Sequence, residues 1–172
     1  WHKLKMPCLS APNQMSFPME MALVREGAEL ILTANPAREI ALLRGKTVYL
    51  PAGKLPAPVA LPLERAAYEL CLTADAGAPM ELCLFGQKLM IDPVADRVFF
   101  GKEEMPLFSG GTRVKVQVIA DRCSLEVFTG DGRACATFEA IADYNLPSLS
   151  LTPKGDVCVT EFSCTRLKGA GA

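Results

Sequence analysis

Carboxylate side chains are the residues of this chain whose chemistry could support catalysis. A pair of carboxylates can hydrolyse a glycosidic bond, one acting as acid and the other as nucleophile or base. Five such side chains lie in the C-terminal half and could converge in a folded domain: Glu126, Asp131, Glu139, Asp143 and Glu161. Glu126 alternates with Leu125 and Val127, so we expect it to face away from their side of a sheet. We therefore interpret these carboxylates as solvated or salt-bridged surface residues, with a stand-alone enzyme as an alternative.

The residues present do not support a nucleophilic triad or a phosphate loop. The single histidine is His2, beside the N-terminus, whereas a Ser-His-Asp or Cys-His arrangement needs a histidine that the fold holds in place. Gly130 and Gly132 lie in a predicted hairpin turn, and no helix follows them to bind a phosphate. We therefore predict neither a nucleophilic triad nor a phosphate site, and no cofactor.

The cysteines are odd in number and lack a C-x-x-C motif. With one histidine in the chain, their spacing does not supply a zinc site. The seven are Cys8, Cys71, Cys83, Cys123, Cys135, Cys158 and Cys164. We interpret them as small buried hydrophobic residues, which favours a cytoplasmic protein and leaves a secreted one open. The alternative is a Cys71–Cys83 disulfide, which would require residues 65–73 and 80–85 to form a hairpin near Ala76-Gly77.

The charge and the aromatic content of the chain limit the partners that can be predicted for it. The 18 basic and 19 acidic residues give a formal net charge of −1 with no basic stripe, so nucleic acid is not predicted as a partner. Apolar runs fall far short of the ~20 residues that a membrane helix needs, so no membrane partner is predicted. The few Trp and Tyr residues are widely scattered, which gives little support for autonomous carbohydrate binding. The chain begins with Trp1 rather than Met, so we expect a trimmed N-terminus.

Short alternating segments separated by turn residues run through the whole chain. Arg113–Val118 is the clearest, because three valines point one way and three polar side chains the other. Prolines make residues 51–62 a predicted connector, and Leu61–Leu70 is the one candidate helix. The pattern predicts an all-β fold, an antiparallel two-sheet β-sandwich of jelly-roll-like form. Further predicted strands are 19–25, 29–33, 40–43, 47–50, 66–73, 80–85, 88–91, 97–100, 123–128, 134–139, 146–151 and 157–164.

Three segments, residues 15–23, 35–44 and 119–132, resemble sequence blocks of one known domain. Their order and spacing, with a final strand at 157–167, are similar to the C-terminal β-sandwich domain of glycoside hydrolase family 32. The resemblance implies a structural role for the residues that carry it, which we call the signature residues. They are Pro18, Glu20, Pro36, Glu39, Arg44, Asp121, Arg122, Ser124, Glu126, Phe128 and Gly132.

The resemblance also implies that catalysis resides elsewhere. The family's catalytic motifs lie in a five-bladed propeller domain, and none of them occurs in this sequence. The parent enzyme would hydrolyse β-fructofuranosidic bonds in sucrose, levan or inulin by a retaining two-carboxylate mechanism without a metal. No catalytic residue follows for this chain, and its substrate-binding residues stay unassigned. Met19 and Cys123 replace an Arg and a Ser of the family pattern, so polar contacts made by those residues would be lost.

We expect three segments: a remnant of the connection from the propeller at residues 1–12, the sandwich at 13–168 and a flexible tail at 169–172. The implied role of the sandwich is to pack against the propeller and stabilise it. An isolated copy should then expose an apolar patch larger than usual for a monomer and form a weak homodimer. The alternative function is an independent fructan-binding module, which exposed aromatic residues on a concave face would favour.

Overall fold

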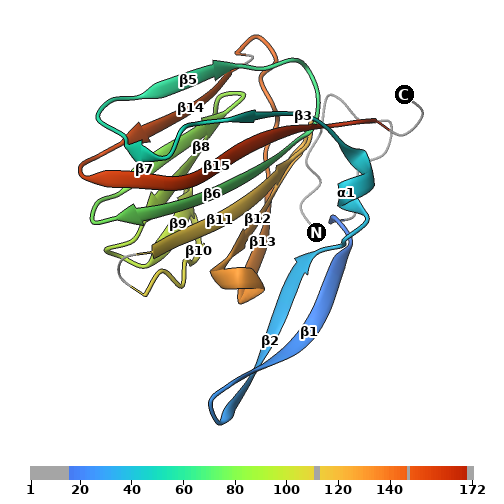
Figure 1. Ribbon diagram of the computed structural model, residues 1–172. Coiled ribbons are helices and arrows are strands. Elements are labelled where there is room, and N and C mark those ends of the chain that lie inside the picture. The colour runs from blue at the N-terminus through green and yellow to red at the C-terminus, as the bar shows by residue number, and fades with distance from the viewer. Residues whose placement is uncertain (1–15, 111–112, 147, 170–172) are drawn as a thin grey trace.

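The computed structural model describes residues 16–110, 113–146 and 148–169. His2, Cys8, the expected linker at residues 1–12 and most of the expected tail therefore lie outside the described residues. In the described part, two antiparallel sheets stack face to face (Figure 1). The predicted all-β antiparallel sandwich is confirmed.

The first layer is a six-stranded sheet with the strand order β10-β9-β8-β7-β14-β5. Its neighbours pair antiparallel throughout. The strands are β5 Val59–Pro62, β7 Met80–Leu84, β8 Gln87–Asp92, β9 Arg97–Phe100, β10 Glu103–Pro106 and β14 Ser148–Pro153.

The second layer is a seven-stranded sheet with the order β13-β12-β11-β6-β15-β3, and β4 pairs with β15 beside this path. A short 3-10 turn, η1 Gly130–Gly132, joins β12 to β13. The strands are β3 Arg44–Tyr49, β4 Gly53–Lys54, β6 Tyr68–Ala76, β11 Arg113–Ala120, β12 Ser124–Thr129, β13 Ala134–Glu139 and β15 Val157–Leu167.

The hydrophobic core fills the space between the two sheets. In β11, Val114, Val116 and Val118 are almost fully buried in this core, while Arg113 and Lys115 are exposed on the opposite face. Phe162 of β15 and Leu82 of β7 meet in the same core from the two layers. The outward face of the seven-stranded sheet is therefore the polar one, as the alternation in β11 predicts.

A separate two-stranded hairpin, β1 Met19–Glu26 and β2 Glu29–Pro36, precedes the sandwich. It extends beyond the two layers (Figure 1), and β2 contacts the sandwich at η1 and β13. Gly27 closes its turn with a φ of +59°, a conformation that glycine adopts without strain. The hairpin predicted from the Glu26-Gly27 turn is confirmed.

Residues 40–43 were expected to form a strand, and the structure instead has one helical turn there, α1 Ile40–Leu43. Backbone N–H groups of Ile40, Ala41 and Leu42 each bond to the carbonyl three residues earlier. Ile40 is buried while Leu42 stays exposed, so the turn packs one side only. No helix in the described part of the chain is long and apolar enough to span a membrane.

The proline-rich connector expected at 51–62 is also partly wrong, because it contains β4 and β5. β5 is an edge strand that pairs only with β14, and Pro62 ends it where a missing N–H is tolerated. Val59 and Leu61 pack against the core. The candidate helix at 61–70 is absent, since that stretch ends β5 and begins β6.

Candidate functional site

The outward face of the hairpin carries a group of exposed apolar side chains. Leu23 and Leu32 are directly opposed across the two strands, and Met21 and Leu30 lie on the same face in the neighbouring pairs. These four side chains are 55–67% exposed. Monomeric proteins seldom leave such a cluster facing water. We call Met21, Leu23, Leu30 and Leu32 the hairpin face.

The opposite side of the hairpin is held against the sandwich by polar contacts. Asn35 donates its side-chain N–H to the backbone oxygen of Asp131, at 3.4 Å. Gly132 has a φ of +87°, which glycine adopts without strain, and a Cβ there would lie 2.6 Å from the Asn35 amide and displace it. Nearer the hairpin tip, Glu26 forms an ion pair with Arg133.

Contacts at the hairpin base fix its two strands to each other and to α1. The N–H of Ala37 donates to the carbonyl of Pro18 at 2.9 Å, immediately after Pro36 ends β2. The guanidinium Nε of Arg38 donates to Glu20 Oε1 at 2.7 Å. This hydrogen bond lowers the pKa of Glu20 and raises that of Arg38.

A small second core covers one end of the outward face of the seven-stranded sheet. Its buried members are Ile119, Phe128 and Leu167 from the sheet and Ile40 from α1. The half-buried residues that complete it include Phe17 and Met19, where the chain enters the hairpin. Met19, which departs from the family pattern, thus contributes apolar packing in place of a charge. The other departure, Cys123, is buried.

Glu126 lies beneath this second core and is 4% exposed, so its interpretation as a solvated or salt-bridged surface residue is wrong. It does face away from Leu125 and Val127, as predicted. Its Oε1 accepts the backbone N–H of Phe17 at 3.4 Å, and its Oε2 accepts the hydroxyl of Thr137. A carboxylate removed from water requires such donors. Glu126 therefore anchors the segment that leads into the hairpin.

Arg44, at the start of β3, forms an ion pair with Glu69 of β6. Its Nε and Nη2 donate to the two carboxylate oxygens of Glu69 at 2.6 and 2.8 Å, a bidentate geometry. Gln117 donates a third hydrogen bond to Glu69 at 2.7 Å. This pairing raises the pKa of Arg44. The sequence reasoning missed Glu69, although its place in an alternating strand, outward between Tyr68 and Leu70, could have suggested it.

The remaining signature residues lie at the surface. Asp121 and Ser124 close the turn between β11 and β12, where the Asp121 N–H donates to the Ser124 carbonyl at 3.0 Å. The exposed Arg122 donates its backbone N–H to Asp121 Oδ1 at 2.7 Å. Glu39 is exposed at the start of α1.

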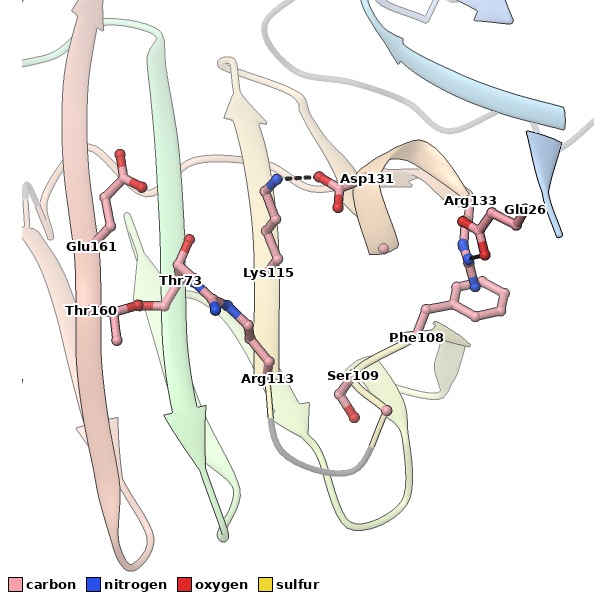
Figure 2. Close-up of a pocket in the computed structure, with 12 residues that line it drawn as sticks. Glu26, Thr73, Phe108, Ser109, Arg113, Lys115, Asp131, Arg133, Thr160 and Glu161 are labelled. Carbon is pink, nitrogen blue, oxygen red and sulfur yellow. Dashed lines mark hydrogen bonds and ion pairs between the residues drawn. The ribbon is translucent and has the colours of Figure 1, made fainter. Parts of the chain in front are cut away.

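A polar groove of about 650 Å³ opens on the outward face of the seven-stranded sheet, beyond the second core. Figure 2 shows Glu161, Thr73 and Arg113 facing it from β15, β6 and β11, with Phe108 on the far rim. A second hollow of about 320 Å³ continues it toward Gln117 and shares four of its lining residues.

The structure places the five candidate carboxylates in different settings. Asp131 and Glu161 line the groove, and Asp131 is paired there with Lys115. Glu126 is enclosed under the second core, while Glu139 and Asp143 are exposed on β13 and in a loop. Among the described residues, no group of three or more His, Cys, Asp or Glu side chains could hold a metal ion.

Five of the described cysteines, Cys71, Cys83, Cys135, Cys158 and Cys164, are free thiols. Cys71 lies in β6 and Cys83 in β7, which belong to different sheets, so the hairpin that would oppose them does not exist and the suggested disulfide is wrong. Burial raises the pKa of both thiols. It raises the pKa of Cys164, which faces the core, to about 12.

Comparisons with known proteins agree with this architecture. A family model described as "Glycosyl hydrolases family 32 C terminal" matches residues 79–144. No curated protein matches the chain in sequence.

Solved structures with the same fold include an exo-inulinase from Aspergillus awamori, with 15% identity, a TM-score of 0.71 and alignment over 90% of this chain and 36% of that one. Fructan 1-exohydrolase IIa from Cichorium intybus has 15% identity and a TM-score of 0.67, over 90% of this chain and 41% of the enzyme. Sucrose-6-phosphate hydrolase from Lactobacillus gasseri has 16% identity and a TM-score of 0.60, with alignment over 86% of this chain and 33% of that one.

The chain thus spans about a third to two-fifths of the length of these solved structures. It shares their fold over most of its own length, and its central strands match the family's C-terminal domain in sequence. The resemblance predicted from the signature residues is therefore confirmed: the chain is similar to the glycoside hydrolase family 32 C-terminal domain in sequence over residues 79–144 and shares its fold with enzymes that include an exo-inulinase and a fructan exohydrolase.

Proposed function

We propose that this chain is the non-catalytic C-terminal domain of a β-fructofuranosidase-type glycoside hydrolase, and that it packs against the enzyme's catalytic propeller and stabilises it. The parent would hydrolyse β-fructofuranosidic bonds in sucrose, levan or inulin. The inulinase, fructan exohydrolase and sucrose-6-phosphate hydrolase that share the fold are each more than twice as long, which leaves room for a catalytic domain beside the sandwich.

The observation that carries the proposal is the exposed hairpin face. A two-stranded hairpin alone is marginally stable in water, and this one turns four large apolar side chains outward. Its other side is fixed to the sandwich through Asn35 and Glu26, so the hairpin face is held in one orientation. A rigid apolar surface on a projecting arm fits a large partner better than a small ligand.

The propeller of the same polypeptide is the occupant that the arrangement favours. The chain enters the hairpin directly, and Phe17 is anchored to Glu126 at that point, so a domain preceding residue 16 would lie close to the hairpin. Covering a half-exposed leucine contributes about 1–2 kcal/mol. Several such side chains would suffice for a stable contact within one polypeptide.

The test uses the parent enzyme and its separately expressed propeller. Leu23→Asp with Leu32→Asp should weaken binding of this chain to the propeller about 100-fold, because a docked charge would lose its hydration. In the parent, the same pair should shorten the half-life of sucrose-hydrolysing activity on heating. Val94→Asp is the matched control, since Val94 is 75% exposed in the turn between β8 and β9.

Three results bear on the proposal. Weakened binding by the hairpin variants alone supports it. Unchanged propeller binding and unchanged heat inactivation in those variants contradict it. The proposal is also overturned if the chain does not bind the propeller but forms a tight homodimer in sedimentation experiments. Loss of that dimer in the hairpin variants would assign the hairpin face to a second copy of the chain.

A further inference from the structure

The loop before β11 presents an aromatic ring in a strained conformation. Phe108 has a φ of +56°, in the left-handed region that bulky residues seldom adopt. Its side chain is nevertheless 43% exposed, so burial of the ring does not account for the strain. Strained residues persist only where their surroundings determine them, and they concentrate at functional sites.

The flanking residues hold this loop from both sides. Ser109 donates its backbone N–H and its hydroxyl to Asp96 Oδ1, at 2.7 and 2.8 Å. Leu107 donates its N–H to the Asp96 carbonyl at 3.0 Å. The hydroxyl of Thr129 donates to the Pro106 carbonyl at 2.8 Å. These hydrogen bonds thus fix the loop that carries the Phe108 ring at the rim of the polar groove.

The ring itself is fixed by two contacts. A Cβ at Gly130 would lie 2.6 Å from the Cβ of Phe108, so this glycine allows the aromatic residue to sit against η1. The guanidinium carbon of Arg133 lies 5.8 Å from the ring centroid, and Arg133 is itself held by Glu26 (Figure 2). Phe108 lines the groove, and the other side chains of the lining are polar.

The groove's polar groups suit a neutral ligand with many hydroxyls. Three acidic side chains, Glu26, Asp131 and Glu161, balance three basic ones, Arg113, Lys115 and Arg133. Among the ion pairs of the described residues, none involves Arg113 or Glu161. A guanidinium donates hydrogen bonds and a carboxylate accepts them, whereas a hydroxyl does both.

We propose that this groove is a non-catalytic binding site for a neutral oligosaccharide, with a sugar ring against Phe108 and hydroxyls bonded to Arg113 and Glu161. Its volume of about 650 Å³ lies within the usual range for small-ligand sites. The carboxylates in its lining disfavour a phosphorylated or otherwise anionic ligand. The proposal goes beyond the docking role and requires no propeller.

The experiment is calorimetric titration of the whole chain. The probes are inulin-type and levan-type oligosaccharides, maltohexaose as a neutral sugar of another linkage, and dextran sulfate as a polyanion. We expect saturable binding of at least one neutral probe. Phe108→Gly and Arg113→Met should each weaken it about tenfold, the size of one aromatic or charge-assisted contact.

Glycine adopts the conformation of residue 108 without strain, so Phe108→Gly removes the ring and leaves the loop able to fold. Thermal unfolding of each variant checks this. Val94→Ala and Arg122→Met, which change exposed residues outside the groove lining, are the matched controls. The double hairpin variant Leu23→Asp with Leu32→Asp should bind the sugar normally, which separates this site from docking.

Each outcome decides the proposal. Weaker binding in the groove variants alone, whichever neutral sugar is bound, supports it. The proposal is overturned if no neutral probe binds, or if the control variants lose as much sugar affinity as the groove variants. It is also overturned if dextran sulfate displaces the sugar and binds more tightly, because the groove would then be a general ionic surface.

Discussion

Replacing Arg44 by Met should destabilise the sandwich substantially. Arg44 gives two hydrogen bonds to Glu69, whose side chain is 2% exposed, so its removal leaves a buried carboxylate with Gln117 as a single donor. Breaking a fully buried pair in this way costs about 3–5 kcal/mol. Because the Arg44 side chain is itself 46% exposed, water can partly replace it. We therefore expect a loss of about 2–3 kcal/mol in the free energy of unfolding.

Thermal and urea unfolding of Arg44→Met measure this loss, and the midpoint temperature should fall by about 5–10 °C. The double variant Arg44→Met with Glu69→Leu is the informative companion, because it removes the orphaned carboxylate together with its partner. It should be more stable than Arg44→Met alone. A midpoint within about 1 °C of the unchanged chain for Arg44→Met, or a double variant that loses the sum of both single changes, would refute the reasoning.

Three further predictions follow from local geometry. Gly132→Ala should cost about 2 kcal/mol, because a φ of +87° strains alanine and its Cβ would displace the Asn35 amide, and proteolysis should then cut the hairpin faster. In the folded chain at pH 8, mass spectrometry should find the exposed Cys135 alkylated quickly and Cys164 unmodified, since burial raises the pKa of the Cys164 thiol to about 12. Hydrogen bonding from the loop holds the pKa of Asp96 below its usual value, so its stabilising effect is complete above about pH 4 and lost as the pH falls through the lower, folded-state pKa. The difference in unfolding free energy between the unchanged chain and Asp96→Ala should therefore shrink in acid.

Much of the sandwich could be predicted from the sequence because its strands have one buried face and one solvent-exposed face. The alternation in β11 and the Glu26-Gly27 turn both gave the observed structure, since side-chain period and turn chemistry are local properties. The four apolar residues of α1 carry no period that separates a strand from a helical turn, so propensity alone misassigned them. β5 was missed because its one proline, Pro62, is tolerated in an edge strand, and strand order cannot be derived from local sequence.

The errors about side chains share another cause, which is contact between distant segments. Cys71 and Cys83 appear to face each other when β6 and β7 are drawn as a hairpin, but the chain crosses from one sheet to the other between them. The alternation of side chains along a strand correctly predicted the side of the sheet on which Glu126 lies. It could not reveal that Phe17, 109 residues earlier, closes over that side and excludes water. The strained Phe108 likewise has no sequence signal apart from the glycines that follow it.

Three of the signature residues share an explanation from their positions beside the hairpin. Glu126 anchors the chain before the hairpin, Gly132 admits Asn35 against its second strand, and Glu20 ties its base to Arg38. A free two-stranded arm has too few contacts of its own to keep one direction. These residues therefore set the angle at which the hairpin face leaves the sandwich. If the hairpin face contacts the propeller, as we propose, these residues specify the geometry of that contact.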